Sequence, residues 1–406
     1  MEYFTYELKN GIRLIHYPTS SEVAYCGLMV NTGSRDEDED EHGMAHFIEH
    51  MLFKGTVKRK PYHILSRMED VGGEINAYTT KEETCIYSSF LKNEYPRAMD
   101  LISDIFLNSS FPEKEMDREK EVIIDEINSY KDAPGELIFD DFEEMIFPDH
   151  PIGRNILGTQ ESLRNFSKKE IRHFILKNYH TNEMIFCSVG NIHFNYLIKY
   201  FDKYFSQIPS NERMKERVKV EVYRPVSLSV KKDTWQTHYI MGATAYDVLD
   251  DRRTGLYLLN NILGGQGLSS RLNMSLREKK GLAYNIESFY SPYFDTGVLS
   301  VYFGTDKENL GKSIRVTNNE MKKLRTVKLG TIQLHKAKKQ IIGQIARGRE
   351  SHESLLFKLG KSFFLFDKFE SLEEIAHKVE AVSAGDILEI AGEMFDPKRL
   401  STLVYK

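Results

Sequence analysis

The two halves of the chain repeat the same order of expected helices and strands, and this repeat constrains the fold most strongly. Ser167 and Ser383 each open an expected helix, at a sequence offset of 216 (383 − 167). Met184 and Leu400 each open an expected strand at the same offset (400 − 184). Two matches at one offset indicate that the chain contains two copies of one folding unit.

A polar segment separates the two copies. Residues from Pro209 to Arg217 are mostly polar or charged, which is typical of a segment between domains. The chain has 406 residues, enough for two domains that each bury a core. We therefore predict an N-terminal domain over residues 1–215 and a homologous C-terminal domain over residues 216–406.

The first copy contains a short motif with the residues of a metal site. His46, Glu49 and His50 form an H-x-x-E-H pattern in a segment that reads as a helix. Residues three and four apart on a helix are neighbours, so both imidazoles can bind one zinc ion and the carboxylate can deprotonate water. We expect His42, separated from this helix by Gly43, to lie in a loop or cap. The alternative is a helix with two unrelated polar residues.

A hydrolytic zinc site has three protein ligands, so the motif needs one more donor. The segment from Glu119 to Asn128 has the pattern of an amphipathic helix. It carries Glu126, at an offset of 76 from His50 (126 − 50), and Glu119, which lies two turns earlier on nearly the same face. Both glutamates are candidates, whereas Asp125 is expected at the surface.

The residues around the motif show a family resemblance. N-T-G-S-R at residues 31–35 precedes the motif, and F-K-G-T at residues 53–56 follows it. This segment resembles the pitrilysin/insulinase/mitochondrial processing peptidase family of zinc metallopeptidases, which uses an inverted zinc motif. The resemblance implies an α+β fold with two homologous domains, each a mostly antiparallel sheet packed with helices.

The resemblance also implies a role for each residue of the site. His46, His50 and Glu126 would hold one zinc ion per chain, and Glu49 would be the catalytic base. Glu119 matches a family glutamate that supports the ligands, with a solvated carboxylate on a helix face as the alternative.

Two further segments match family segments that contact the substrate. Gly72–Thr79 matches an edge strand that pairs with extended substrate backbone, which would place Asn76 and Ala77 at the substrate. A purely structural edge strand is the alternative. Arg277 and Tyr284 match a pair that holds the scissile carbonyl and stabilises its developing charge. The sequence leaves open whether this pair acts on its own chain or on a partner chain.

The second copy lacks the metal set. Gln344 falls roughly where Glu126 lies in the first copy, and the helix around residues 256–259 has no histidine pair. We therefore expect the first domain to carry the zinc chemistry and the second to shape the substrate cleft.

These observations predict a zinc metalloendopeptidase that hydrolyses short or unfolded peptides. Related enzymes surround a closed chamber with four such domains, so a two-domain chain is expected to form a homodimer. A non-catalytic scaffold subunit of the same family and a processing peptidase of narrow specificity are the alternatives. The sequence leaves open the physiological substrate.

Composition excludes several other classes of partner. A net charge of −5 argues against nucleic acid. Three scattered cysteines without a C-x-x-C pair indicate reduced thiols. The first residues lack the pattern of a signal peptide, and no stretch approaches about 18 apolar residues. We therefore expect a cytoplasmic protein without a membrane partner.

Overall fold

The computed structural model describes residues 3–214, 216–220 and 223–406. The predicted domain boundary at residue 215 falls outside these residues and stays a prediction. The chain forms two compact units, each of which draws on both halves of the sequence. The first comprises Met1–Ser129, Arg154–Val218 and Gly348–Phe369; the second comprises Tyr130–Gly153, Lys219–Arg347 and Glu370–Lys406.

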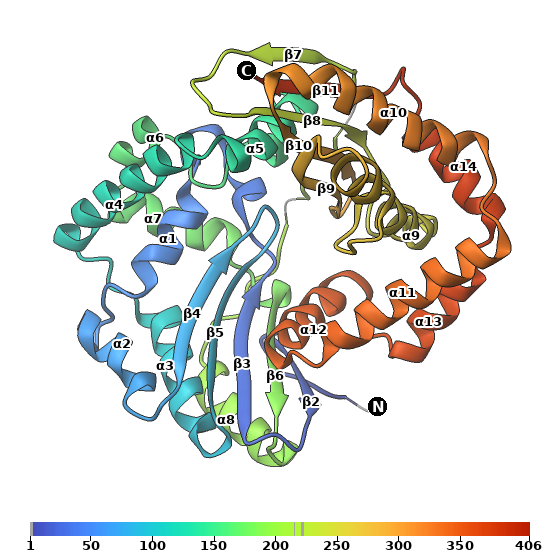
Figure 1. The fold of residues 1–406 in the computed structure, drawn as a ribbon. Helices are drawn as coiled ribbons and strands as arrows, with labels where there is room; N and C mark the ends of the chain where they lie inside the picture. Colours follow the sequence, from blue (N-terminus) through green and yellow to red (C-terminus); the bar gives the residue numbers. More distant parts are fainter. Residues whose placement is uncertain (1–2, 215, 221–222) are drawn as a thin grey trace. The chain divides into compact units, whose positions relative to one another are not determined.

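The first unit is built on a six-stranded sheet with the order β1-β2-β6-β3-β5-β4 (Figure 1). Its strands are β1 (Phe4–Glu7), β2 (Arg13–Pro18), β3 (Val23–Val30), β4 (Glu74–Thr79), β5 (Thr84–Leu91) and β6 (Met184–Gly190). Among these pairs, β2 and β6 run parallel and the other neighbours run antiparallel. Every residue of β6 is buried, because helices cover both faces of the sheet.

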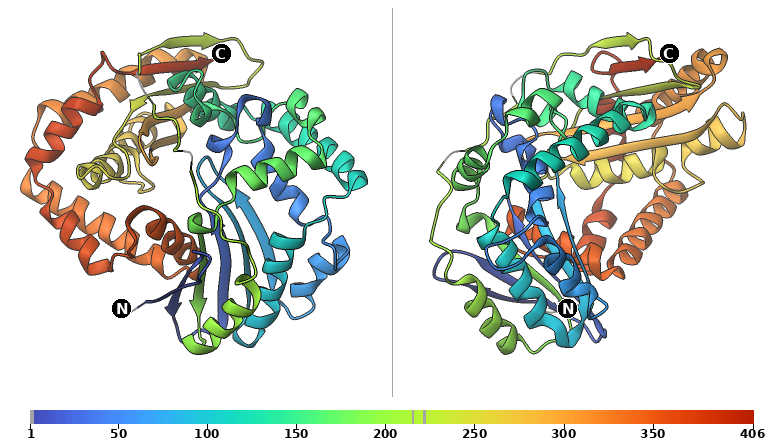
Figure 2. Two further views of the ribbon diagram at one scale, coloured as in Figure 1. Left: turned by 180° about the vertical axis from the view of Figure 1, so that it is seen from behind. Right: turned by 90° about the vertical axis from the view of Figure 1, so that its left-hand side faces the viewer.

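One face of this sheet carries helices from the first half of the chain. These are α1 (Met44–Leu52), α2 (Pro61–Glu69), α3 (Tyr95–Asn108), α4 (Glu113–Lys131), α6 (Gln160–Asn165), α7 (Lys168–Asn178) and α8 (Phe194–Phe205). Figure 2 shows α3 and α8 in front of the strands when the molecule is seen from behind. Apolar residues of α3 and α8 join Leu14 and Leu28 of the sheet in one core.

The opposite face is covered by α12 (His352–Phe366), which lies far along the sequence. Leu355, Leu356 and Leu359 pack on Met29 of β3 and Ile185 of β6. Spacings of three and four residues place these leucines on one side of the helix, so α12 buries a continuous apolar stripe.

The second unit repeats this design with a five-stranded sheet of the order β7-β11-β8-β10-β9. Its strands are β7 (Ser227–Val230), β8 (Thr237–Thr244), β9 (Ala283–Pro292), β10 (Gly297–Thr305) and β11 (Ser401–Tyr405). The order matches β2-β6-β3-β5-β4, and the parallel pair, β7 with β11, falls at the equivalent place. The predicted α+β fold with an internal duplication is confirmed. Neither β1 nor α8 has a counterpart in the described part of this unit.

Helices cover the second sheet in the same way. One face carries α9 (Arg253–Gly264), α10 (Leu310–Thr326), α11 (Thr331–Arg349), α13 (Leu372–Ala381) and α14 (Ala384–Met394). The other face is covered by α5 (Pro134–Ile146), whose Ile138 and Phe142 join Ile240, Leu403 and Tyr405 in one core.

The two sequence repeats therefore exchange one helix each. The helix α12 of the second repeat belongs to the first unit, and α5 of the first repeat belongs to the second unit. The starts of α4 and α5 differ by 21 in the numbering (134 − 113), and so do the starts of α11 and α12 (352 − 331). The helices α5 and α12 are thus equivalent in the repeat, yet each covers the sheet of the opposite half of the sequence. Among the described residues, no helix is long and apolar enough to cross a bilayer.

The packing of α12 gives a test of this exchange. A Cβ atom at Gly360 would meet Met29 and would lie 2.9 Å from Sγ of Cys187. We expect Gly360→Ala to lower the free energy of unfolding by about 1–3 kcal/mol, because overpacking a buried contact forces side chains to shift. Urea denaturation measures the change.

Gly343→Ala is the matched control. Gly343 lies within α11, and a Cβ atom added there would meet no neighbouring atom of the described residues within 4 Å. Alanine should therefore stabilise this helix by up to about 1 kcal/mol. Equal effects of the two substitutions would contradict the close packing of α12 on the first sheet.

Candidate metal centre

The motif helix α1 begins at a left-handed glycine and a buried carboxylate. Gly43 has φ +94°, and a Cβ atom there would lie 2.7 Å from Cα of Gly158. Glu37 accepts hydrogen bonds of 2.9 Å from the N–H groups of Gly43 and Ala45, which are free at the start of the helix. Burial raises the pKa of Glu37 to about 8, although both N–H groups act to lower it.

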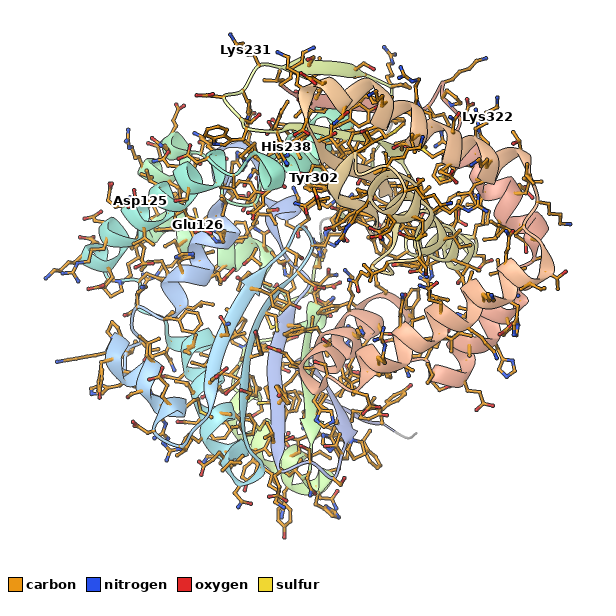
Figure 3. All side chains as sticks on the ribbon, viewed as in Figure 1. Asp125, Glu126, Lys231, His238, Tyr302 and Lys322 are labelled. Carbon is orange, nitrogen blue, oxygen red and sulfur yellow. The ribbon has the colours of Figure 1, made fainter. Side chains whose placement is uncertain are left out.

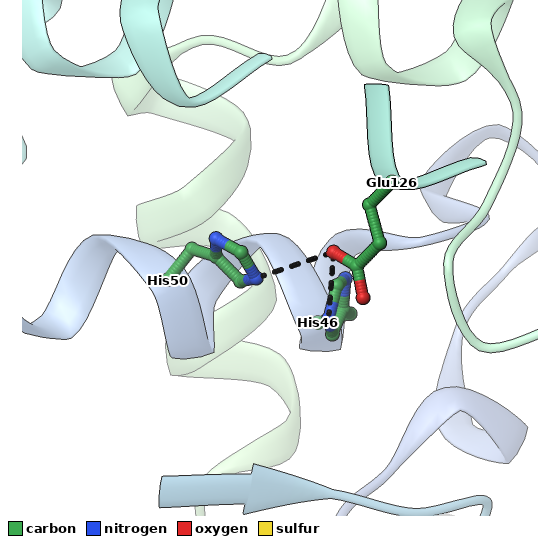
Figure 4. Close-up of side chains that lie close together, drawn as sticks. All are labelled: His46, His50 and Glu126. Carbon is green, nitrogen blue, oxygen red and sulfur yellow. Dashed lines mark ion pairs between the residues drawn. The ribbon is translucent and has the colours of Figure 1, made fainter. Parts of the chain in front are cut away.

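Three donor groups converge beside this helix. Oε2 of Glu126 lies 3.7 Å from Nε2 of His50 and 4.0 Å from Nε2 of His46 (Figure 4). One ligand atom from each residue lies within 4.8 Å of the other two. Ligands about 2.0–2.2 Å from a tetrahedral zinc ion are about 3.3–3.6 Å apart, so small side-chain movements suffice to close the set.

The third donor, Glu126, comes from α4. The same helix also contacts α1 through Glu119. This buried carboxylate accepts a hydrogen bond of 3.1 Å from Nδ1 of His50 and forms an ion pair of 2.6 Å with Nζ of Lys54. With Nδ1 engaged, His50 presents Nε2 towards Glu126. The supporting carboxylate fixes the tautomer and the ring orientation that a metal ligand requires.

The charge states of the motif residues suit metal binding. Burial and, to a smaller extent, the neighbouring His50 lower the pKa of His46 to about 4, so this imidazole is neutral near pH 7. Burial raises the pKa of Glu49, whereas the Thr79 hydroxyl and His50 act to lower it. Glu49 is therefore a better proton acceptor than an exposed glutamate, and it lies close enough to Glu126 to feel its charge.

Neighbouring polar residues fall outside this set. Asp125 is exposed on α4 beside Glu126, as Figure 3 shows, and is not among the grouped donors. His42 follows the 3-10 turn Glu39–Glu41, and its Nε2 lies 2.8 Å from the carbonyl oxygen of Asn155.

The predicted substrate strand is the edge strand β4. It pairs with β5 on one side and packs against α1, so the motif helix lies beside it. Asn76 is exposed, and Ala77 is largely buried. Thr79, the last residue of β4, carries the hydroxyl that acts to lower the pKa of Glu49.

Arg277 and Tyr284 belong to the second unit. Arg277 lies in a π-helical turn, Asn273–Glu278, and its Nε is 3.6 Å from a carboxylate oxygen of Glu278. Tyr284 lies near the start of β9, the edge strand equivalent to β4, and its side chain is 75% exposed. This turn packs against β9, so both side chains come from adjoining elements.

One part of the first unit was missed by the sequence analysis. Arg217 donates a 2.8 Å hydrogen bond to Asp36, and Arg213 also bonds this carboxylate. Burial acts to raise the pKa of Asp36, but Arg217, Arg213 and the N–H group of Gly33 together outweigh it, so the net pKa is lowered. The polar segment that contains Arg213 and Arg217 is therefore bonded to the loop that leads into α1. The charged composition of this segment was the only sequence signal for these bonds.

Comparison with known proteins places the chain in a family. The model of the insulinase family, peptidase family M16, matches residues 14–160, and the model named peptidase M16 inactive domain matches residues 165–341. An uncharacterized zinc protease of Bacillus subtilis, YmxG, is 33% identical over 96% of this chain and 95% of its own. The chain belongs to the insulinase family, M16. The predicted resemblance is thus confirmed.

Two further similar proteins match nearly the whole chain. An uncharacterized zinc protease of Rickettsia bellii is 32% identical over 98% of this chain and 96% of its own. The structure of a protease from Helicobacter pylori superposes with a TM-score of 0.90 at 21% identity, covering 100% of this chain and 99% of the other. That structural likeness confirms the fold.

The duplicated structure shows what the second copy lacks. The first residues of α4 and α11 lie 218 positions apart (331 − 113), and both helices have 19 residues. The same offset places Gln344 opposite Glu126 and Ala337 opposite Glu119. The equivalent helix of the second unit therefore carries neither carboxylate.

The bond between Glu119 and His50 can be tested through metal affinity. We expect Glu119→Gln to weaken zinc binding about 10–100-fold, because a neutral amide holds the imidazole less firmly than a carboxylate. Competition with a chromogenic chelator measures the affinity. Asp125→Asn removes the same charge from the same helix and should leave the affinity nearly unchanged; equal losses would show that only overall charge matters.

Proposed function

We propose that this chain is a zinc metalloendopeptidase of the M16 family. The observation that carries the proposal is the convergence of His46, His50 and Glu126 with Glu49 beside them. Relatives named zinc proteases support the same conclusion.

The residues of the site fit a zinc ion. Two imidazoles and one carboxylate are donors that zinc accepts, and three protein ligands are typical of a hydrolytic site. The exposed Glu126, with 45% of its side chain accessible, leaves one side open to a peptide. When bound, zinc supplies a Lewis acid that polarises the peptide carbonyl and makes water acidic near neutral pH.

Glu49 then performs the proton transfers. Its raised pKa suits a base that takes a proton from the attacking water and returns it to the leaving amine. Glu119 and Lys54 hold His50 during these steps and are positioning residues.

Substrate binding is proposed at the free edge of β4. An extended peptide would pair with the backbone near Asn76 and Ala77, which reads main chain more than side chains. Arg277 and Tyr284 would stabilise the carbonyl oxygen, as the family resemblance implies. Short or unfolded peptides suit this mode, and a homodimer would provide the closed chamber of related enzymes. Three buried free cysteines suit a reducing compartment such as the cytoplasm.

A non-catalytic scaffold subunit remains the alternative from another class. The model named inactive domain matches residues 165–341, whereas the proposed metal ligands all lie before residue 165, in the first unit. A catalytic chain should bind about one zinc per protomer and lose activity to chelators. Cleavage of a peptide library separates broad from narrow specificity.

Glu49→Gln tests the proposed base directly. We expect turnover to fall about 10²–10⁴-fold, because an amide cannot accept the proton, while zinc content stays the same. A quenched fluorescent peptide and metal analysis measure the two quantities. Glu121→Gln, at an exposed position of α4, is the control and should retain activity. Full activity of Glu49→Gln with bound zinc would refute the assigned role.

A mixing experiment tests whether Arg277 and Tyr284 serve a partner chain. Glu49→Gln and Arg277→Ala chains should each be nearly inactive, since one lacks the base and the other lacks a donor to the carbonyl oxygen. If the pair acts in trans within a dimer, the mixture recovers activity. No recovery, with subunit exchange verified by a tag, assigns the pair to its own chain.

A further inference from the structure

The face of the first sheet that α12 covers continues to the free edge of β4. Tyr78 of β4 packs against the core beneath α12, whereas Ile75 and Ala77 belong to the core of the opposite face. Alternate residues of a strand share a side, so Glu74 and Asn76 lie on the α12 face with Tyr78. A peptide bound along β4 would continue this alternation and point every second side chain to the α12 face.

Aromatic rings line this face close to the edge. The Phe357 ring of α12 lies 5.0 Å from the Tyr78 ring on β4 and 4.8 Å from the Tyr87 ring on β5, measured between centroids. The Tyr25 ring of β3 lies 6.3 Å from the His352 ring at the start of α12. The tyrosine and phenylalanine rings are only partly buried, so they leave aromatic surface accessible.

Two carboxylates stand among these rings. Glu353 lies one turn before Phe357 and therefore on the same side of α12. Glu74 lies in one row with Ser89 of β5 and Tyr25 of β3 across the sheet. Burial, Glu353 and Glu74 together raise the pKa of Tyr25, which agrees with both carboxylates lying near this ring. Neither glutamate forms an ion pair with any residue that the structure describes.

The lysines of α12 are engaged elsewhere. Lys358 donates a hydrogen bond of 3.2 Å to the carbonyl oxygen of Gly348. Lys361 acts to lower the pKa of Glu83, which burial raises, and Glu83 lies beyond the end of β4 that is opposite to Glu74. The start of β4 therefore presents negative charge that the described part of α12 does not pair.

The second unit keeps the aromatic rings of this arrangement. Phe139 lies five residues after the start of α5, as Phe357 does in α12 (139 − 134; 357 − 352). It contacts Phe289 of β9 at 5.2 Å and Tyr302 of β10 at 5.0 Å, much as Phe357 contacts the rings of β4 and β5. The rings therefore belong to the packing of the duplicated fold.

The two carboxylates have no counterpart in the second unit. Gly135 stands one residue after the start of α5, where α12 has Glu353 (135 − 134; 353 − 352). Asn285 stands four residues before the packed ring of β9, where β4 has Glu74 (289 − 285; 78 − 74). The one carboxylate of β9, Glu287, lies two residues before that ring. Packing of a helix on the sheet thus requires neither Glu74 nor Glu353.

We infer that Glu74 and Glu353 form a subsite for a lysine or arginine side chain of the peptide bound along β4. The carboxylates and the faces of the tyrosine rings stabilise the cation, and its apolar stem packs on Phe357. The inference rests on the proposed binding of peptide at β4. It gives the substrate a class, namely peptides with a basic residue in the bound strand.

Quenched fluorescent peptides measure the preference. Each peptide carries one lysine at a different position of a neutral sequence, and its control carries glutamine at that position. We expect kcat/KM of the lysine peptide to exceed that of its control about three- to tenfold where the side chain faces α12, as for a partly exposed ion pair. The neighbouring positions should show no preference, because their side chains face the other side.

Variants of the intact chain test the two carboxylates. Glu353→Gln should lower the ratio of lysine to glutamine peptide towards one, and Glu74→Gln should lower it partly. Glu353→Lys should favour a peptide with glutamate at the same position, because the sign of the charge is exchanged. Asp367→Asn is the matched control and should keep the ratio, since it removes a carboxylate from the other end of α12, where it pairs with Arg13. Zinc content verifies that each variant is folded.

A binding assay separates this inference from the proposed function. Labelled lysine and glutamine peptides are titrated with the Glu49→Gln chain, and fluorescence anisotropy gives each Kd without cleavage. If the unmodified chain cleaves no peptide, the proposed peptidase activity is wrong, and the ratio of the two Kd values still decides the subsite. Equal Kd values or no binding would overturn the inference. A ratio that Asp367→Asn lowers as much as Glu353→Gln, or a lysine preference that Glu353→Lys retains, would also overturn it.

Discussion

The bridge from His50 through Glu119 to Lys54 is the interaction on which the candidate site depends. His46 and His50 share one helix, whereas Glu126 comes from a second helix much further along the chain. Their donor atoms can meet only if α1 and α4 keep a fixed distance. Glu119 joins the two segments directly, because one buried carboxylate contacts both His50 and Lys54 of the motif segment. The start of α1 is fixed separately by Glu37 and by the contact between Gly43 and Gly158.

Local patterns were sufficient to predict much of this structure. The helices that carry His46 and Glu126, and the strands that begin near Met184 and Leu400, have strong periodicity or clear capping residues. The exchange of α5 and α12 could not be predicted, because an apolar stripe does not specify which of two similar sheets it will cover. The bonds of Arg213 and Arg217 to Asp36 were missed for a related reason. Polar composition alone does not distinguish an exposed connection from one that is tied down.

The two duplicated units share one fold but differ in the residues of one helix and in one sheet edge. Both units keep the same strand order, because a sheet buried between helices tolerates few changes of topology. Gln344 and Ala337 of α11 stand at the positions that Glu126 and Glu119 occupy in α4, so α11 lacks those donors. The described second unit also lacks counterparts of β1 and α8, which leaves β7 at an open edge. These differences between the described copies thus fall at the helix pair of the candidate metal centre and at one sheet edge.

The exchanged helices have a consequence for synthesis on the ribosome. The last strand of the first sheet ends at Gly190, but α12 is complete only at Phe366, after nearly half of the chain has been added. At typical elongation rates this interval lasts about 10–35 s. Throughout it, the nascent chain presents Met29 and Ile185 on an uncovered sheet face. The first half therefore cannot reach its mature state during translation of that half alone, and a nascent-chain chaperone has an apolar surface to protect.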